Sequence, residues 1–471
     1  MIQDLPAAAS LGREAVTSVT YLAAAVLFIL GLKGLTAAKT ARRGMQYAAL
    51  GMFLAVVGTL WHESIVSYGW IVGGLVIGAV IGWPLGTRVP MTAMPQRVAL
   101  ALTFGALAAT LVGIAEYYTR LQSHIPISRP IVAALGFEVL FGALTITGAL
   151  VASGKLQELL PGRPITFRGQ NALNIALLGL MLLMLGYLVI YPEAQLVFYA
   201  LVGLALLMGV SLVLPIGGGD MPVVIALLNS YSGLAAAATG FAIDNSLLII
   251  AGALDGASGF ILSILMSKAM NRSLANVLFG AFGTGGGEST ATLEGAMVEV
   301  RIDDAALQLA YARKVVIVPG YGLAVAQAQQ VVRELAELIE ARGGEVKYAI
   351  HPVAGRMPGH MNVLLAEAHV PYEVLLELED INPEFPEVDV AVVIGANDVV
   401  NPAARTDRSS PIFGMPILDV DRAKAVFVLK RGKGKGFAGI ENALFFAPRT
   451  RMLYGDAKST LQGLVAAVKS V

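Results

Sequence analysis

The first 270 residues of the chain consist largely of long apolar runs separated by short polar segments. A helix needs about 20 apolar residues to cross the hydrocarbon core of a bilayer, and the runs are close to that length. The residues before the first run lack a basic cluster, so we interpret that run as a retained helix and not as a cleaved signal peptide. The pattern predicts nine membrane-spanning helices, at 17–35, 45–61, 67–86, 98–118, 130–153, 171–191, 195–214, 222–242 and 246–268.

Lys and Arg residues in the short loops indicate the orientation of these helices, because cytoplasmic loops carry an excess of both. One side has ten of them: Lys39, Arg42, Arg43, Arg88, Arg97, Lys155, Arg163, Arg168, Lys268 and Arg272. The other side has three: Arg13, Arg120 and Arg129. This bias predicts that the N-terminus lies outside and that everything after residue 270 lies in the cytoplasm.

The pattern changes after residue 313, where short apolar runs alternate with helical segments. The runs rich in β-branched residues lie at 315–318, 346–350, 388–395 and 425–430. The clearest helical segment, 326–344, ends at paired glycines. Buried strands that alternate with helices predict a Rossmann-like, doubly wound parallel sheet over 314–471. A Gly-, Ser- and Thr-rich tether over 271–313 joins it to the membrane domain of 1–270, and 303–314 adds a short amphipathic helix to that tether.

Composition supports this division and excludes several classes of site. Of all residues, 56% are hydrophobic and 14% are charged, whereas soluble domains have roughly 25% charged residues. The 33 basic and 33 acidic residues balance, so no overall field attracts the chain to nucleic acid. There is no cysteine, which excludes thiol catalysis, iron–sulfur clusters and thiolate zinc sites.

Parallel sheets bind ligands at the carboxyl ends of their strands. The first strand leads into a G-x-G-x-x-V turn, in which Gly320 allows a tight turn and Gly322 lets the backbone approach a pyrophosphate. The same letters also fit an ordinary glycine turn between a strand and a helix. After the second strand, the acid that holds the ribose of NAD is missing, and the nearest charged side chain is Arg356. This arrangement favours NADP over NAD.

The third and fourth strands also end in polar residues. Asn397 and Asp398 follow the third strand, and the fourth leads into 429–439, where four cations alternate with glycines. Such a run is often a solvated basic loop. Directly after a buried strand, however, cationic side chains and free backbone N–H groups favour a phosphate clamp.

Six segments of the chain resemble one family. They lie at 217–241, 268–273, 319–329, 351–368, 395–404 and 455–459. They are similar to the β subunit of proton-translocating nicotinamide nucleotide transhydrogenase, and the resemblance covers essentially the whole chain. It implies that a hydride passes directly between NAD(H) on an α subunit and NADP(H) on the C-terminal domain of this chain, coupled to a proton that crosses the membrane. No side-chain acid or base is implied for the hydride step.

The resemblance also implies partners and a location. The α subunit carries the NAD(H) domain and further membrane helices, and two αβ units form a dimer in the bacterial cytoplasmic (inner) membrane. The sequence has no second G-x-G-x-x-G/A fingerprint for NAD, which agrees with a partner chain.

In the family NADP is bound in an inverted orientation, so the 2′-phosphate is expected on Lys430 and Arg431, and Arg356 is expected near the other phosphates or the nicotinamide. His351 either has a local role or orders its loop. Phe437 stands where the family often has Tyr. The nucleotide-contacting positions that the resemblance implies are Gly320, Tyr321, Gly322, Val325, Val353, Ala354, Gly355, Arg356, Met357, Pro358, Gly395, Ala396, Asn397, Asp398, Val399, Gly414, Met415, Lys430, Arg431, Gly432, Lys433, Gly434, Lys435, Gly436, Phe437, Asp456 and Ala457.

Polar groups inside the spans are candidates for the proton path. Asn229 and Asp220 match positions that matter for coupling in the family, and Ser230 is adjacent to Asn229. Glu138 and Asp255 are charged residues within spans, and either a channel role or a local partner would explain them. For the serines, hydrogen bonding between helices is the simpler interpretation.

The membrane part also departs from well-known members of the family. Leu102 stands where they have a histidine, and Ala149 stands where they have a serine. His62 and His124 lie at span ends on the outer face and do not replace that histidine. The proton acceptor is then either a histidine of the partner or Glu138.

Two other functions remain open at this point. One is an ion channel or transporter gated by a regulatory NADP-binding domain, although no pore loop is evident in the sequence. The other is a redox-inactive NADP-binding scaffold.

Overall fold

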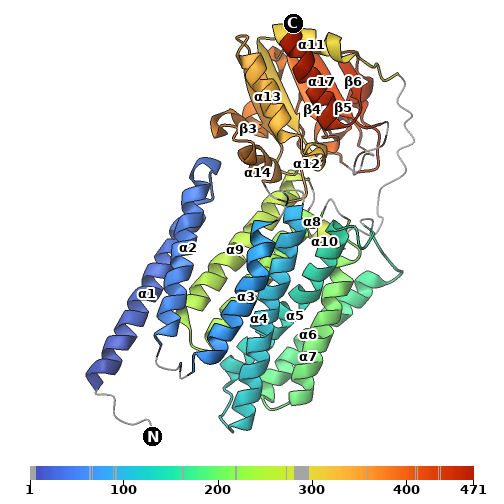
Figure 1. Cartoon of the computed structure of the whole chain (residues 1–471). Helices are drawn as coiled ribbons and strands as arrows, with labels where there is room; N and C mark the ends of the chain where they lie inside the picture. The colour runs from blue at the N-terminus through green and yellow to red at the C-terminus, as the bar shows by residue number, and fades with distance from the viewer. Residues whose placement is uncertain are drawn as a thin grey trace. The chain divides into compact units, whose positions relative to one another are not determined.

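The structure is a computed structural model that describes residues 7–62, 65, 67–88, 90, 93–161, 164–217, 220–271, 273–279, 296–357, 359–408, 410, 412–432, 434, 436 and 438–471. Its contacts divide the chain into two units. One comprises Met1–Ile216 with Val224–Ser263, and the other comprises Gly217–Val223 with Ile264–Val471. The first unit is helical, and the second contains a β-sheet (Figure 1).

Each predicted span coincides with a helix. The helices are α1 (Ala7–Gly34), α2 (Ala38–Leu60), α3 (Gly69–Thr87), α4 (Met94–Gln122), α5 (Arg129–Leu156), α6 (Gln170–Ile190), α7 (Gln195–Val213), α8 (Met221–Ala242) and α9 (Ser246–Ala269). All but α2 are among the eight helices of the described residues that are long and apolar enough to cross a membrane. Helix α2 has 23 residues, but its first two turns contain Lys39, Arg42 and Arg43. The short helix α10 (Leu274–Phe279) follows.

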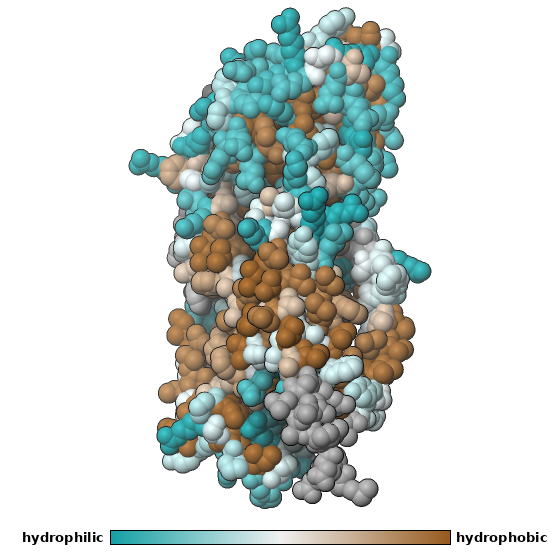
Figure 2. Space-filling model, turned by 90° about the vertical axis from the view of Figure 1, so that its left-hand side faces the viewer, coloured by the Kyte–Doolittle hydropathy of each residue, from teal (hydrophilic) through white to brown (hydrophobic). Residues whose placement is uncertain are grey.

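Large hydrophobic side chains cover the outside of the helical unit. Trp70, Leu183 and Leu196 are 90%, 75% and 84% exposed, respectively. Hydrophobic residues dominate the surface of these helices in Figure 2, whereas the surface of the sheet unit is mostly hydrophilic. An apolar surface of this extent is stable against lipid and not against water, so the helical unit is a membrane domain.

Helices α5 and α8 form the centre of the membrane domain, since they have the largest buried shares among the candidate spans. Helix α5 packs against α4, α6 and α7. Helix α8 lies close to α9 because both lack a side chain at the crossing. A Cβ on Gly233 would lie 2.4 Å from the backbone nitrogen of Gly256. In contrast, no residue of α3 is buried.

The C-terminal unit has six parallel strands in the order β3-β2-β1-β4-β5-β6. They are β1 (Lys314–Pro319), β2 (Glu345–Ile350), β3 (Leu375–Glu377), β4 (Val390–Ile394), β5 (Ala425–Lys430) and β6 (Thr450–Tyr454). The four predicted strands are confirmed as β1, β2, β4 and β5, and β3 and β6 extend the sheet at both edges. Val315 pairs with Val346 on one side and with Val390 on the other. This strand order is that of dinucleotide-binding folds, and its switch point lies between β1 and β4.

Layers of helix cover both faces of the sheet. In Figure 1, α13 (Gln329–Glu340) and α17 (Ala457–Ser470) lie on one face. The other face packs on a core that includes Phe385 and Phe445. These two residues belong to the short 3-10 helices η3 (Asn382–Glu387) and η6 (Ala443–Phe446). The remaining short helices include α14 (His360–Glu367), α15 (Leu378–Ile381), α16 (Ala403–Thr406) and the 3-10 helices η4 (Asp398–Val400) and η5 (Val420–Arg422).

The helix predicted at 326–344 is confirmed as α13, and a separate short helix precedes it. Helix α12 (Tyr321–Ala326) ends at Gln327, whose φ is +48°, and α13 begins at Gln329. The left-handed backbone at Gln327 interrupts the helix and turns the chain before α13.

Residues 296–313, which we expect from the sequence to form part of the tether, pack against the sheet unit. The amide of Val300 donates to the Met452 carbonyl oxygen at 3.0 Å, and the amide of Met452 donates to Val298 at 2.8 Å. Helix α11 (Ile302–Tyr311) then packs against α17. It coincides with most of the amphipathic helix predicted at 303–314, which ends three residues early because Lys314 begins β1. Residues 280–295 of the predicted tether, and Arg272 within it, lie outside the described residues.

Candidate functional site

The loops after β1 and β4 touch through bare glycine backbones at the switch point. A Cβ on Gly322 would lie 2.6 Å from the Cα of Gly395, and a Cβ on Gly320 would lie 2.4 Å from the Gly395 carbonyl oxygen. The amides of Gly320 and Gly322 donate to Ile394 and Gly395 at 2.9 and 3.0 Å. At Gly322 the missing side chain makes room for Gly395, and the Gly322 amide already donates to the Gly395 carbonyl oxygen.

Tyr321, Arg356 and His360 form a cluster above this contact. The Arg356 guanidinium carbon lies 4.3 Å from the centre of the Tyr321 ring. The backbone amide of Arg356 donates to Nδ1 of His360 at 3.0 Å. His360 is 1% exposed, and its Nε2 has no hydrogen-bond partner among the described residues. Burial, and secondarily the Arg356 charge, lower the pKa of His360. Because Nδ1 accepts the Arg356 amide hydrogen, the proton of the neutral imidazole lies on Nε2.

His351 holds the loop after β2 in place. It is 2% exposed, and its Nε2 donates to the Pro416 carbonyl oxygen at 2.8 Å, while its Nδ1 accepts from the Val353 amide at 3.2 Å. Burial lowers the pKa of His351 to about 4, although the bond to Pro416 acts in the opposite direction. Both nitrogens are used in bonds to the backbone, which agrees with the interpretation that His351 orders its loop.

The polar residues after β4 support the glycine-rich loop after β5. The Asp398 carboxylate accepts from the Ala438 amide at 2.8 Å. The Asn442 side chain donates to the backbone and side-chain oxygens of Asn397 at 2.9 and 3.0 Å. A Cβ on Gly436 would lie 2.3 Å from Asp398 Oδ1. The loop therefore folds down onto the end of β4 only because residue 436 has no side chain.

Lys430 and Arg431, the two expected phosphate ligands, differ in their surroundings. The Lys430 ammonium donates to the Gly434 carbonyl oxygen and lies 4.5 Å from the centre of the Phe445 ring. Burial lowers its pKa, and the Asp398 charge acts in the opposite direction. Arg431 is exposed. The neighbouring expected ligands Lys433, Lys435 and Phe437 lie outside the described residues.

Most of the other expected contacts follow the ends of β1, β2, β4, β5 and β6, whereas Gly414 and Met415 lie between α16 and η5. Asp456 caps α17, because its carboxylate accepts from the amides of Lys458 and Ser459 at 3.0 and 3.2 Å. Gly355 and Gly414 have φ values of +118° and +79°, which favour glycine. Pro358 lies outside the described residues. The positions that complete this set are Val325, Val353, Ala354, Met357, Ala396, Val399, Met415, Gly432, Gly434 and Ala457.

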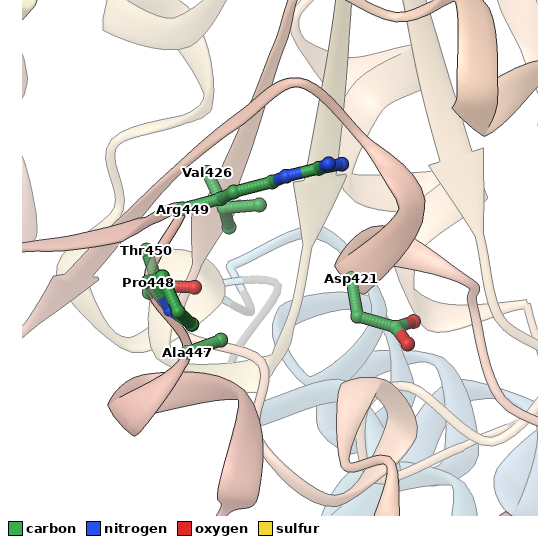
Figure 3. Close-up of a pocket in the computed structure, with 6 residues that line it drawn as sticks. All are labelled: Asp421, Val426, Ala447, Pro448, Arg449 and Thr450. Carbon is green, nitrogen blue, oxygen red and sulfur yellow. The ribbon is translucent and has the colours of Figure 1, made fainter. Parts of the chain in front are cut away.

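A separate cavity of about 180 Å³ lies at the opposite edge of the sheet, where β5 and β6 begin. Figure 3 shows Asp421 across from the segment Ala447–Thr450, with Val426 beside it. Ligand pockets are usually about 300–1,000 Å³, and parallel sheets bind ligands at the other strand ends. We therefore assign no function to this cavity.

In the membrane domain, the structure brings together two of the predicted polar residues. The Asn229 amide of α8 donates to the Asp255 carboxylate of α9 at 2.9 Å. Ser230 donates to the Gly256 carbonyl oxygen at 2.7 Å, which agrees with the interpretation of the serines as links between helices. Asp220 precedes the first turn of α8.

Glu138 is not part of this pair. It is fully buried on α5, and its Oε1 accepts from the Thr239 hydroxyl of α8 at 2.7 Å. Thr239 is ten residues from Asn229, which is about 15 Å along a helix. Leu102 is half-buried, Ala149 is buried, and His62 and His124 are exposed just after α2 and α4.

Comparison with known proteins adds an independent observation. Residues 17–467 match the family described as NAD(P) transhydrogenase beta subunit. This chain belongs to that family. The NAD(P) transhydrogenase subunit beta of Rhodospirillum rubrum is 49% identical over 464 residues, which cover 97% of this chain and 99% of that protein. A protein of the same name from one strain of that species has the same identity and coverage.

Three residues of these sites are not predicted from the sequence. His360 lies within a segment that carries the resemblance, but the letter alone does not show that its imidazole binds the Arg356 amide. Asn442 lies three residues beyond the basic loop at 429–439. Thr239 lies in a run of small residues that indicates only helix packing. A hydroxyl within a span is the one signal that could have indicated Thr239.

Proposed function

We propose that this chain binds NADP(H) at the carboxyl ends of β1, β2, β4 and β5. The observation that carries the proposal is the convergence of four loops at this edge, with cations on two sides of the glycine contact at the switch point. On one side, Arg356 follows β2 and lies over the Tyr321 ring. On the other side, Lys430 and Arg431 lie at the end of β5. The buried, unpartnered Nε2 of His360 is a hydrogen-bond donor that a ligand would satisfy.

The residues of this edge fit a 2′-phosphorylated dinucleotide. Lys430 and Arg431 would hold the 2′-phosphate, since cationic side chains bind phosphate through charge-assisted hydrogen bonds. Asp398 and Asn397 would keep the loop after β5 over the nucleotide. The bound nucleotide supplies hydride chemistry, and the protein supplies binding and orientation.

The activity that we propose is hydride transfer between NAD(H) on an α subunit and NADP(H) on this chain, coupled to proton translocation. The beta-subunit family name implies an α partner. The nucleotide edge described above uses one dinucleotide fingerprint, which leaves the second nucleotide to that partner. We further propose that two αβ units form a dimer in the bacterial inner membrane, with the N-terminus outside and the C-terminal unit in the cytoplasm.

For the proton we propose a path along α8. The bonded pair Asn229 and Asp255, with Ser230 beside it, forms the part nearer the start of the helix, where Asp220 lies. Glu138 forms a second polar station nearer its end. Ionisable groups inside a membrane are costly to keep, so their presence supports a functional role.

The test uses the chain purified with its α partner and inserted into lipid vesicles. We expect NADH to reduce an NADP analogue while protons move into or out of the vesicles. Ion flux without hydride transfer would contradict the proposal and support a gated channel. The absence of both, with NADPH still bound, would support a scaffold.

A further inference from the structure

Among the described residues of the membrane domain, one carboxyl group is fully enclosed, where α4, α5 and α8 meet. Glu138 of α5 is 0% exposed. Its Oε1 accepts from Thr239 at 2.7 Å, whereas its Oε2 has no hydrogen-bond partner among the described residues. Within that part of the chain, Glu138 also takes part in no ion pair. A permanently charged carboxylate in this position would be costly, so the group is suited to hold a proton.

Helix α4 closes the site with a glycine. A Cβ on Gly113 would lie 2.8 Å from the carboxyl carbon of Glu138 and 2.9 and 3.0 Å from its two oxygens. Atoms cannot approach so closely without displacement, so α4 reaches the carboxyl only because residue 113 has no side chain. The missing side chain of Gly113 thus provides the space that the Glu138 carboxyl group occupies.

The Thr239 hydroxyl can satisfy Glu138 in both protonation states. Its oxygen lies 2.7 Å from Glu138 Oε1 and 3.0 Å from the backbone oxygen of Ala235. A hydroxyl has one proton to donate and also accepts. When Glu138 is charged, Thr239 donates to it. When Oε1 carries a proton, that proton is donated to Thr239, and the hydroxyl turns to donate to Ala235.

We propose that Glu138 is the group that carries the translocated proton within the membrane domain, and that Thr239 is its positioning residue. The inference rests on the proposed transhydrogenase function and identifies its proton carrier. An O–H bond forms at Oε1 with a proton from water on one side of the membrane and breaks when that proton leaves to water on the other side. No further reactant is needed, and the site returns to its initial charge.

A charged pair lies between the Glu138 site and the C-terminal end of α4. Glu116 and Arg120 lie three and seven residues after Gly113, on the same face of α4. They are bonded to each other at 2.6 Å, and Arg120 also donates to the Ala242 carbonyl oxygen of α8 at 3.2 Å. Their side chains are 26% and 19% exposed. In the opposite direction along α8 lies the Asn229–Asp255 pair.

The experiment compares variants of the full αβ complex in vesicles. Glu138→Gln keeps the shape of the side chain but cannot exchange a proton, so we expect proton pumping to fall by about 100-fold or more, with NADPH binding unchanged. Thr145→Val is the matched control. Thr145 is a fully buried hydroxyl on α5 that bonds to the backbone oxygen of Phe141 at 2.7 Å, and its loss should leave pumping at the wild-type level.

Infrared difference spectroscopy between acid and alkaline samples provides a second readout. We expect a carboxylic-acid band that is absent in Glu138→Gln. In Thr239→Val the band should remain but shift in frequency, because Oε1 has lost its partner, and Thr239→Ser should restore it. Both Thr239 variants keep the Glu138 carboxyl group, so this second test does not depend on the stability of Glu138→Gln.

The outcomes separate this inference from the proposed function. If the wild-type complex transfers hydride and pumps protons while Glu138→Gln pumps equally well, the inference is wrong. A carboxyl band that persists in Glu138→Gln, or is unaffected by Thr239→Val, also contradicts it. If the wild-type complex does neither, the proposed function itself is wrong.

Discussion

Lys430 and Arg431 stand at the end of β5 and are the proposed ligands of the 2′-phosphate. We expect the double substitution Lys430→Ala and Arg431→Ala to weaken NADPH binding and leave NADH binding nearly unchanged, because only NADPH has the 2′-phosphate. Charge-assisted hydrogen bonds contribute roughly 1.5–3 kcal/mol each. Titration of the full chain with both nucleotides measures the preference. Lys424→Ala is the control, since Lys424 lies at the start of the same strand and pairs with Asp389 at 2.8 Å. Equal affinities in the unmodified chain would refute the clamp.

His351 should give the sheet unit a pH-dependent stability. Its pKa is about 4 in the folded chain, below the ordinary value of about 6.5. The unfolded chain therefore binds more protons between these values, and stability falls as the pH decreases from about 6.5 to about 4. The loss approaches about 3 kcal/mol. We expect His351→Gln to remove this dependence, as followed by thermal unfolding of residues 296–471 at several pH values. An imidazole that titrates near 6.5 by NMR would show that the prediction is wrong.

Single residues show where sequence-based prediction ends. The roles of Gly320 and Gly395 as small residues at strand ends follow from their positions. The close contact between Gly322 and Gly395 does not follow from their positions, because it joins segments more than 70 residues apart in the sequence. In the same way, the sequence predicts that Asn229 and Asp255 are two polar groups within spans. It does not predict their hydrogen bond, which forms because α8 packs against α9.

At the scale of elements, α11 is a stabilising part of the sheet unit. Leu309 is fully buried, whereas Leu307 on the same helix is 50% exposed. We expect Leu309→Ala to lower the free energy of unfolding of residues 296–471 by about 2–5 kcal/mol. Leu307→Ala, the control, should change it by less than about 0.5 kcal/mol. Denaturant unfolding measures both, and similar small effects would mean that α11 does not pack on α17.

The close crossing of α8 and α9 depends on two glycines, Gly233 and Gly256. Gly233→Val would place a side chain within the backbone of α9, separate the helices and break the bond between Asn229 and Asp255. We expect proton pumping by the αβ complex to be lost while NADPH binding by the sheet unit is kept. Gly73→Val on α3 is the control, because nothing lies within 4 Å of a Cβ there. Normal pumping by Gly233→Val would contradict this account.

Helices and strands with a distinct apolar pattern were predictable from the sequence, and those without one were not. The nine predicted helices have long apolar runs and the four inner strands have short runs rich in β-branched residues, and both sets are confirmed among the described residues. Strand β3 has three residues and β6 is partly polar, so neither has a distinct pattern. The break at Gln327 was not predictable, because the apolar spacing continues through it while the backbone turns left-handed.

At the scale of the whole molecule, the absence of cysteine makes the orientation directly testable. Ser123 follows α4 and Ser273 follows α9, and both are exposed. We expect Ser123→Cys to react with an impermeant thiol reagent only from outside the cell, and Ser273→Cys only in inverted vesicles. The unmodified chain has no thiol to react. Reaction from the reversed sides would show that the orientation is wrong.

The paired glycines at the switch point restrict how this protein can change over generations. Gly322 and Gly395 each occupy the space that a side chain on the other would need, and Gly395 also has a φ of +67°. A single mutation at either position is therefore penalised, and no compensating change at the other is available, since glycine is already the smallest residue. We expect both positions to remain glycine in diverging lineages, because a side chain at either one would separate the two loops.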